Sequence, residues 1–130
     1  VAGSTGFAPI KSMIEDMAAK GIARDITLYW GARRLEGLYS DLPAKWAAQN
    51  PRFKYIPVLS EVSEQGIRHG LVHRAVLEDH PDLSRFQVYA CGVPVMTEAA
   101  RREFLAAGLP ADEFFTDAFV TRAEVASAGP

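Results

Sequence analysis

Apolar runs suited to β-strands alternate with segments of helical periodicity along most of the chain, and this alternation constrains the fold most strongly. We expect strands at residues 26–30, 53–59, 86–91 and within 113–119, after a first strand at Val1 and Ala2. The spacing of apolar residues predicts helices over residues 10–20, 42–49, 71–79 and 94–107. This order is typical of a parallel sheet with helices on both faces. The sequence therefore predicts an α/β fold with three layers, αβα, around a five-stranded parallel sheet.

A chain of 130 residues is short enough for one domain. We expect the domain to occupy residues 1–119, and residues 120–130, which are rich in Ala, Ser and Gly, to form a flexible tail. Only two residues precede the first glycine turn, fewer than a central strand usually contains. We therefore expect the amino-terminal strand to be truncated in this sequence.

Composition argues against several classes of protein. The net charge is −2, with both signs mixed along the chain and no basic stripe, so no nucleic-acid partner is expected. No apolar run reaches the roughly 18–20 residues of a membrane span, and no signal segment is evident. The single cysteine, Cys91, can supply neither an internal disulfide nor a four-thiolate iron–sulfur cluster. The three histidines lack partners at metal-ligand spacing, so we expect no metal site. The single cysteine and the lack of an evident signal segment make a cytoplasmic setting the default expectation.

The first turn, Gly3-Ser4-Thr5-Gly6, leads into a helix that contains Pro9 near its start. Glycines allow a ligand to approach the backbone, the two hydroxyls add donors, and a helix N-terminus favours an anion. The turn matches neither the P-loop nor the G-x-G-x-x-G fingerprint. A phosphate site is therefore predicted only in combination with other features, and a glycine-rich loop without a ligand is the alternative.

Ligands of open parallel sheets bind at the carboxyl ends of the strands, so the residues that follow each strand are the candidates for a site. After the first turn, these residues are Gly31-Ala32-Arg33-Arg34, Ser60-Glu61, Cys91-Gly92-Val93-Pro94-Val95-Met96 and Asp117-Ala118-Phe119.

In this order and spacing, the motifs resemble the nicotinamide-dinucleotide-binding domain of the ferredoxin–NADP reductase superfamily. The likeness is strongest to the iron–sulfur flavoprotein reductases that serve bacterial oxygenases. The resemblance implies a domain that binds NADH, with NADPH second, and delivers hydride to FAD on a flavin domain absent from this chain. Electrons would pass on to an iron–sulfur centre or an oxygenase. The isolated chain is then expected to lack reductase activity, and its exposed flavin-facing surface to favour self-association.

The resemblance also assigns roles to the first turn and to the loop after the second strand. Gly3, Ser4, Thr5 and Gly6, with Pro9 behind them, would cradle the pyrophosphate, and Thr5 would lie near the nicotinamide. In the loop after the second strand, Gly31 and Arg33 would lie near the pyrophosphate or a ribose. The alternative for Arg33 is a solvated loop arginine.

Ser60 and Glu61 would face the adenosine ribose. A carboxylate can accept from a 2′-hydroxyl and repels a 2′-phosphate, so Glu61 predicts a preference for NADH. In the alternative, Glu61 points to solvent and Arg68 supplies a phosphate contact.

Cys91 and Gly92 would sit against the nicotinamide, with Cys91 and Thr5 nearest the transferred hydride and Cys91 acting through position and polarity. Met96 would pack under the nucleotide, and Phe119 would cover the flavin ring, although here the chain continues past it. Plain packing is the alternative for Cys91, Met96 and Phe119.

Two other functions remain open from the sequence alone. One is a non-redox nucleotide-binding or sensor module on the same fold. The other is a flavodoxin-like or receiver-type signalling domain. A receiver requires an acidic cluster at the strand ends, where this chain carries glycines, a serine and one glutamate.

Overall fold

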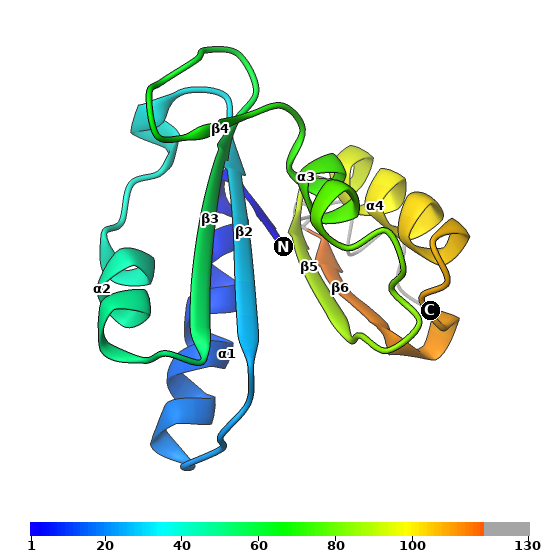
Figure 1. Ribbon diagram of the computed structural model, residues 1–130, viewed down its shortest axis with the longest axis horizontal. Helices are drawn as coiled ribbons and strands as arrows, with labels where there is room; N and C mark the ends of the chain where they lie inside the picture. The colour runs from blue at the N-terminus through cyan, green and yellow to red at the C-terminus, as the bar shows by residue number, and fades with distance from the viewer. Residues whose placement is uncertain (119–130) are drawn as a thin grey trace, which may run out of the picture.

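The computed structural model describes residues 1–118, which form a six-stranded parallel sheet with helices on both faces (Figure 1). The strands are β1 (Ala2–Gly3), β2 (Ile26–Ala32), β3 (Phe53–Leu59), β4 (Arg68–His69), β5 (Val88–Gly92) and β6 (Phe114–Ala118). The helices are α1 (Phe7–Ala19), α2 (Leu42–Gln49), α3 (Val72–Asp79) and α4 (Pro94–Ala106). Short 3₁₀ turns are η1 (Ser4–Gly6), η2 (Leu35–Gly37) and η3 (Ala111–Glu113).

The predicted α/β class is confirmed, but the predicted strand number is wrong. The sheet has six strands in the order β4-β3-β2-β1-β5-β6, because β4 adds to the outer edge of β3. This strand has two residues, Arg68 and His69, which pair with Val58 and Leu59. A two-residue polar strand inside a loop gives no hydrophobic alternation, so the sequence pattern could not reveal it.

The two faces of the sheet have separate cores. On one face, α1 and α2 pack on a cluster that includes Leu28 and Trp30. On the other face, α3 and α4 pack on a cluster that includes Tyr29 and Val58. Neighbouring residues of β2 thus point to opposite cores, as expected for a parallel sheet buried on both sides.

Two element boundaries differ from the expected ones in a way that matters for the site. Helix α1 begins at Phe7 rather than residue 10, because the aromatic ring of Phe7 is buried and stacks on Trp30. Strand β5 begins at Val88 rather than residue 86, since Phe86 and Gln87 pair with no strand of the described part of the chain. Pro9 is therefore the third residue of α1, where its missing N–H still costs no helical hydrogen bond.

The strand order places a topological switch point between β1 and β5. From β1, the chain proceeds through β2, β3 and β4 to one edge, and then crosses to β5 and β6 on the other side. Connections diverge at such a point, and a ligand crevice forms at the carboxyl ends of the two strands. Within residues 1–118, no helix is both long and apolar enough to cross a bilayer.

Candidate nucleotide-binding site

The turn η1 lies tightly against the carboxyl end of β5. A Cβ atom on Gly6 would overlap the carbonyl oxygen of Cys91 and lie 2.9 Å from the amide nitrogen of Gly92. The backbone of Gly6 has φ −62° and ψ −8°, which any residue can adopt. The close contact with β5, rather than an unusual dihedral angle, therefore requires glycine here.

Ser4 holds an unusual backbone conformation at this turn. Its φ is 47°, the left-handed region that non-glycine residues rarely occupy. The indole Nε1–H of Trp30 donates to the carbonyl oxygen of Ser4 at 2.8 Å, and the Trp30 ring stacks on Phe7 with centroids 4.2 Å apart. A buried tryptophan on β2 thus fixes the turn, and backbone strain held in this way is common at ligand sites.

Sequence reasoning placed Trp30 only at the end of the strand expected over residues 26–30 and did not assign it this role. The available signal was chemical, because a buried indole N–H needs an acceptor.

The hydroxyl side of the turn faces outward. Ser4 and Thr5 are exposed, while Gly6 and Phe7 are buried. Helix α1 has Gly6 at its N-cap and no side-chain cap hydrogen bond, so no side chain of residues 1–118 caps the amides at its N-terminus. This arrangement presents two hydroxyls and a helix N-terminus together at the switch point, which suits a phosphate group.

Gly3, Gly92 and Met96 lie close together where the neighbouring strands β1 and β5 end. A Cβ atom on Gly3 would lie 3.0 Å from the Cε of Met96, and one on Gly92 would lie 2.7 Å from the same methyl. Gly92 has φ 157°. The structure therefore brings Gly3, Gly92 and Met96 together, with the methionine methyl against both strand ends.

Cys91 lies behind this surface. Its residue exposure is 5%, and it belongs to the core cluster on the α1 face together with Phe7 and Trp30. A side chain so placed contributes packing and local polarity rather than an exposed thiolate.

Gly31 has a packing role. A Cβ atom there would lie 2.5 Å from the Cβ of Val72, so this glycine allows α3 to approach β2. Gly31 was predicted to bind the cofactor, and this contact shows that it also allows α3 to pack against β2.

Arg33 and Glu61 lie side by side where β2 and β3 end. The backbone pairing continues past both strands, because the amide of Ser60 donates to Ala32 and the amide of Glu61 donates to Arg33. The Nε of Arg33 is 3.6 Å from the Oε2 of Glu61, and the two side chains are 83% and 47% exposed. This weak pair leaves both charged groups accessible to a ligand.

Arg68 is held by carboxylates. Its guanidinium lies 2.7 Å from Asp79 and 2.9 Å from Glu78, and the hydroxyl of Tyr29 donates to Asp79 at 2.6 Å. The hydrogen bonds from Tyr29 and Arg68 hold the pKa of Asp79 below its usual value. These contacts fasten β4 to α3, and they disfavour the alternative in which Arg68 serves a phosphate.

A buried histidine joins α3 to α4. The Nε2 of His73 lies 2.8 Å from the Oε2 of Glu103. Burial tends to raise the pKa of Glu103, but the hydrogen bond with His73 and nearby positive charges outweigh it and lower that pKa.

Within residues 1–118, no group of three or more His, Cys, Asp or Glu side chains is placed to hold a metal ion. Phe119, predicted to cover a flavin, lies outside the described residues.

A parallel sheet with a glycine-rich turn at its switch point defines the class of nucleotide-binding α/β domains. Within that class, the chain belongs to the oxidoreductase NAD-binding domain family, whose model matches residues 1–102. The predicted resemblance to ferredoxin reductase-like NAD-binding domains is thereby confirmed.

Relatives of this chain include reductase components of larger systems. It is 48% identical over 121 residues to the CDP-6-deoxy-L-threo-D-glycero-4-hexulose-3-dehydrase reductase of Yersinia pestis, covering 92% of this chain and 37% of that protein. It is 39% identical over 126 residues to the terephthalate 1,2-dioxygenase reductase component 2 of Comamonas sp, covering 93% and 37%.

Among solved structures, the Amycolatopsis cytochrome P450 reductase GcoB superposes with a TM-score of 0.85 at 29% identity, covering 92% of this chain and 36% of that one. The chain thus spans little more than a third of the length of these relatives.

Proposed function

We propose that this chain is the NADH-binding domain of a flavin-dependent reductase. In this proposal the dinucleotide lies across the carboxyl ends of β1, β2, β3 and β5. FAD, held by another part of the longer protein, accepts hydride from NADH and releases the electrons singly to an iron–sulfur centre or an oxygenase. The observation that carries the proposal is the turn η1, where two exposed hydroxyl residues adjoin a helix N-terminus without a side-chain cap at the switch point.

The residues of the turn would bind and orient the pyrophosphate. Ser4 and Thr5 offer hydroxyl donors, and the uncapped start of α1 offers amides and a positive dipole end. Gly3 and Gly92 would leave the backbone beside the nicotinamide free of Cβ atoms, and Met96, whose methyl packs against both glycines, would lie under the nucleotide. Thr5 would orient the ring from the turn, and Cys91 would set the polarity behind it without acting as a nucleophile.

Glu61 would select NADH over NADPH. Its exposed carboxylate can accept hydrogen bonds from the ribose hydroxyls, with Ser60 beside it, and it repels a 2′-phosphate. Arg33, 3.6 Å away, would bind a phosphate or ribose oxygen on the turn-facing side. Arg68 is paired with two carboxylates, so the described residues offer no competing arginine in this loop.

A flavin-bearing domain would dock on the exposed apolar residues beside the proposed nicotinamide position. Val93 is 59% exposed and Val95 is 82% exposed, and both lie at the start of α4 beside Gly92. Phe119 would contribute its aromatic ring to the flavin. Without that domain, the same surface would favour self-association of the isolated chain. The single cysteine fits a cytoplasmic setting.

The test is a calorimetric titration of the chain with NADH and NADPH, repeated for Arg33→Ala, Glu61→Gln and the control Arg34→Ala. Arg34 is a neighbouring exposed arginine without a proposed ligand contact. We expect tighter binding of NADH, weakening of roughly 10-fold in Arg33→Ala, and a smaller NADH preference in Glu61→Gln. Tighter binding of NADPH would contradict the role of Glu61. No binding of either nucleotide at millimolar concentration would contradict a site formed by this chain alone.

A further inference from the structure

The segment between β2 and α2 starts at the carboxyl end of β2, beside the proposed dinucleotide site (Figure 1). It contains Tyr39, a large aromatic residue that is 56% exposed. The Tyr39 ring lies 5.0 Å from the Trp30 ring at an interplanar angle of 85°, and 6.1 Å from the Phe7 ring at 69°. Both pairs have the edge-to-face geometry that aromatic rings favour. Tyr39 therefore packs on the two stacked rings next to the turn η1.

Trp30 carries the hydrogen bond that holds this turn. Its indole Nε1–H donates to the carbonyl oxygen of Ser4 at 2.8 Å, and Ser4 has a φ of 47°, which is strained for a serine. Trp30 is 0% exposed, although β2 ends only two residues later. Because Tyr39 covers Trp30 on the side nearer the solvent, its ring keeps water away from the indole. A hydrogen bond screened from water is stronger, so Tyr39 supports the contact between Trp30 and Ser4.

The segment itself holds Tyr39 in place. A Cβ atom on Gly37 would lie 2.7 Å from the Cβ of Ala32, so η2 folds closely back on the end of β2. Leu38, the residue before Tyr39, packs against the core cluster on the α1 face. The ring of Tyr39 is thus presented by an anchored segment, which lowers the entropic cost of its contacts. The same segment begins with Arg33, so it also joins this proposed ligand-binding arginine to the turn.

We propose that Tyr39 is a positioning residue for dinucleotide binding. Its ring keeps the Trp30 indole on the Ser4 carbonyl oxygen, and thereby keeps η1 in the conformation that binds the pyrophosphate. This inference rests on the proposed function. A turn that adopts its binding conformation only part of the time binds with an affinity reduced by that fraction. Loss of the Tyr39 ring therefore weakens NADH binding even though Tyr39 itself does not touch the nucleotide.

The first test is a calorimetric titration with NADH of the unchanged chain and of Tyr39→Ala, Tyr39→Phe and Leu35→Ala. Leu35 is the matched control, because it is an apolar residue of the same segment and is 47% exposed. We expect Tyr39→Ala to weaken NADH binding roughly 5-fold, as for the loss of one aromatic pair. Its melting temperature should fall by less than about 5 °C, because the residue is exposed. Tyr39→Phe keeps the ring and should bind NADH like the unchanged chain, and so should Leu35→Ala.

The second test asks whether Tyr39 acts through Trp30. A chain that carries Trp30→Phe has no indole N–H to position, so adding Tyr39→Ala should change its NADH affinity by less than about 2-fold. NMR exchange of the Trp30 indole N–H with solvent supplies a readout without any nucleotide. We expect this exchange to become roughly 5-fold faster in Tyr39→Ala and to stay unchanged in Leu35→Ala.

Several results would overturn the role of Tyr39 while leaving the proposed function intact. One is an equal loss of NADH affinity in Tyr39→Ala and Leu35→Ala, and another is a full 5-fold loss from Tyr39→Ala in the Trp30→Phe chain. A loss in Tyr39→Phe as large as in Tyr39→Ala would show that the hydroxyl contacts the nucleotide directly.

Failure of the proposed function has a different signature, because the unchanged chain would then bind no NADH. The indole exchange still tests the contact in that case, and an unchanged rate in Tyr39→Ala would overturn the hold of Tyr39 on Trp30.

Discussion

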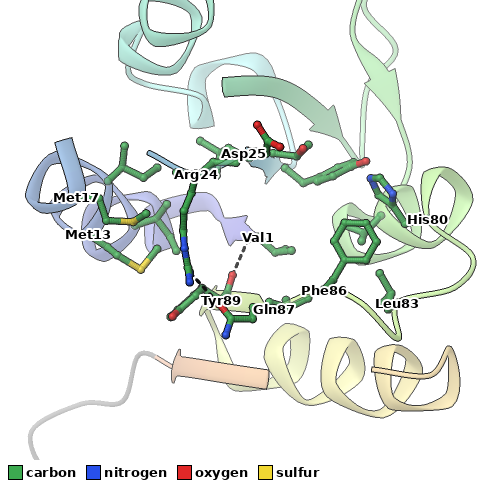
Figure 2. Close-up of a pocket in the computed structure, with 18 of the residues that line it drawn as sticks. Val1, Met13, Met17, Arg24, Asp25, His80, Leu83, Phe86, Gln87 and Tyr89 are labelled. Carbon is green, nitrogen blue, oxygen red and sulfur yellow. Dashed lines mark hydrogen bonds between the residues drawn. The ribbon is translucent and has the colours of Figure 1, made fainter. Parts of the chain in front are cut away.

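The two ends of the central strands differ sharply in how closely the residues around them pack. At the carboxyl ends of β1 and β5, the space is so tight that Gly6 has no room for a methyl group against Cys91. At the amino ends of β2 and β5, a groove of about 820 Å³ lies open between apolar walls. The comparison teaches that contacts within this chain pack the proposed nucleotide-binding end of the sheet closely, whereas apolar side chains line an open groove at the opposite end (Figure 2).

The largest expected effect on stability tests the close packing at the carboxyl ends of β1 and β5. Gly6→Ala should destabilise the fold by about 3 kcal/mol, because the new methyl group meets the backbone of β5, which cannot move without disturbing the sheet. The matched control is Gly21→Ala, where no atom lies within 4 Å of the added carbon and only the backbone conformation at φ 68° opposes the change. This control should cost about 1 kcal/mol. Urea unfolding measures both, and equal costs would show that the contact at Gly6 is not as tight as described.

The next largest effect distinguishes the role of Trp30 in shaping the turn η1 from its role in core packing. Trp30→Phe removes the indole donor to Ser4 and should cost about 2 kcal/mol while also weakening NADH binding. Trp46→Phe is the control, because Trp46 belongs to the same aromatic cluster, with its ring 6.1 Å from Phe7, but has no described hydrogen bond to the turn. We expect Trp46→Phe to leave NADH affinity unchanged. Calorimetry that finds equal losses of affinity would contradict the role of Trp30 in shaping the turn.

A smaller effect concerns the charges that fasten β4 to α3. The folded-state pKa of Asp79 is lowered by its hydrogen bonds from Tyr29 and Arg68, so the stabilisation it gives is complete well above the unfolded pKa of about 3.9. That stabilisation is lost as pH falls below about 4, through the lowered pKa. Asp79→Asn should therefore cost about 1–2 kcal/mol at pH 7 and progressively less in acid.

The control for this charge network is Glu78→Gln, because the Glu78 side chain is 70% exposed. It should cost less than about 0.5 kcal/mol. Denaturant unfolding at pH 7 and at pH 3 gives both values. A cost for Asp79→Asn that does not change with pH would show that its charge has no part in holding the strand.

The smallest effect on stability falls on the residues with the largest proposed role in binding. Arg33 and Glu61 form an exposed pair at 3.6 Å, so Arg33→Ala should change the free energy of unfolding by less than about 0.5 kcal/mol. Its NADH affinity should nevertheless fall, whereas Arg34→Ala should change neither quantity. Thermal unfolding measures the change in stability, and calorimetric titration measures the change in NADH affinity. A loss of stability as large as that of Asp79→Asn would mean that Arg33 supports the fold rather than a ligand.

Periodicity and strand-end logic predict most of the fold from the sequence. The alternation of elements gives the α/β class and the places of α2 and β3, and it brings Arg33 and Glu61 to neighbouring strand ends. The sequence pattern misses β4, because two polar residues in a loop carry no periodic signal. It also misses the hydrogen bond from Trp30 to Ser4, because that contact depends on packing between distant segments. Whether the predicted residues bind the dinucleotide stays a prediction.

The contrast between the two ends of the sheet is tested most directly by mapping backbone amide shifts by NMR as NADH is added to the chain. The account predicts that the shifts of Gly3, Thr5, Gly6, Glu61 and Gly92 change with NADH, and that those of Asp25 and Gln87 beside the groove do not. Shift changes centred on Asp25 and Gln87, or none anywhere at millimolar NADH, would contradict a dinucleotide site at the carboxyl ends of the strands.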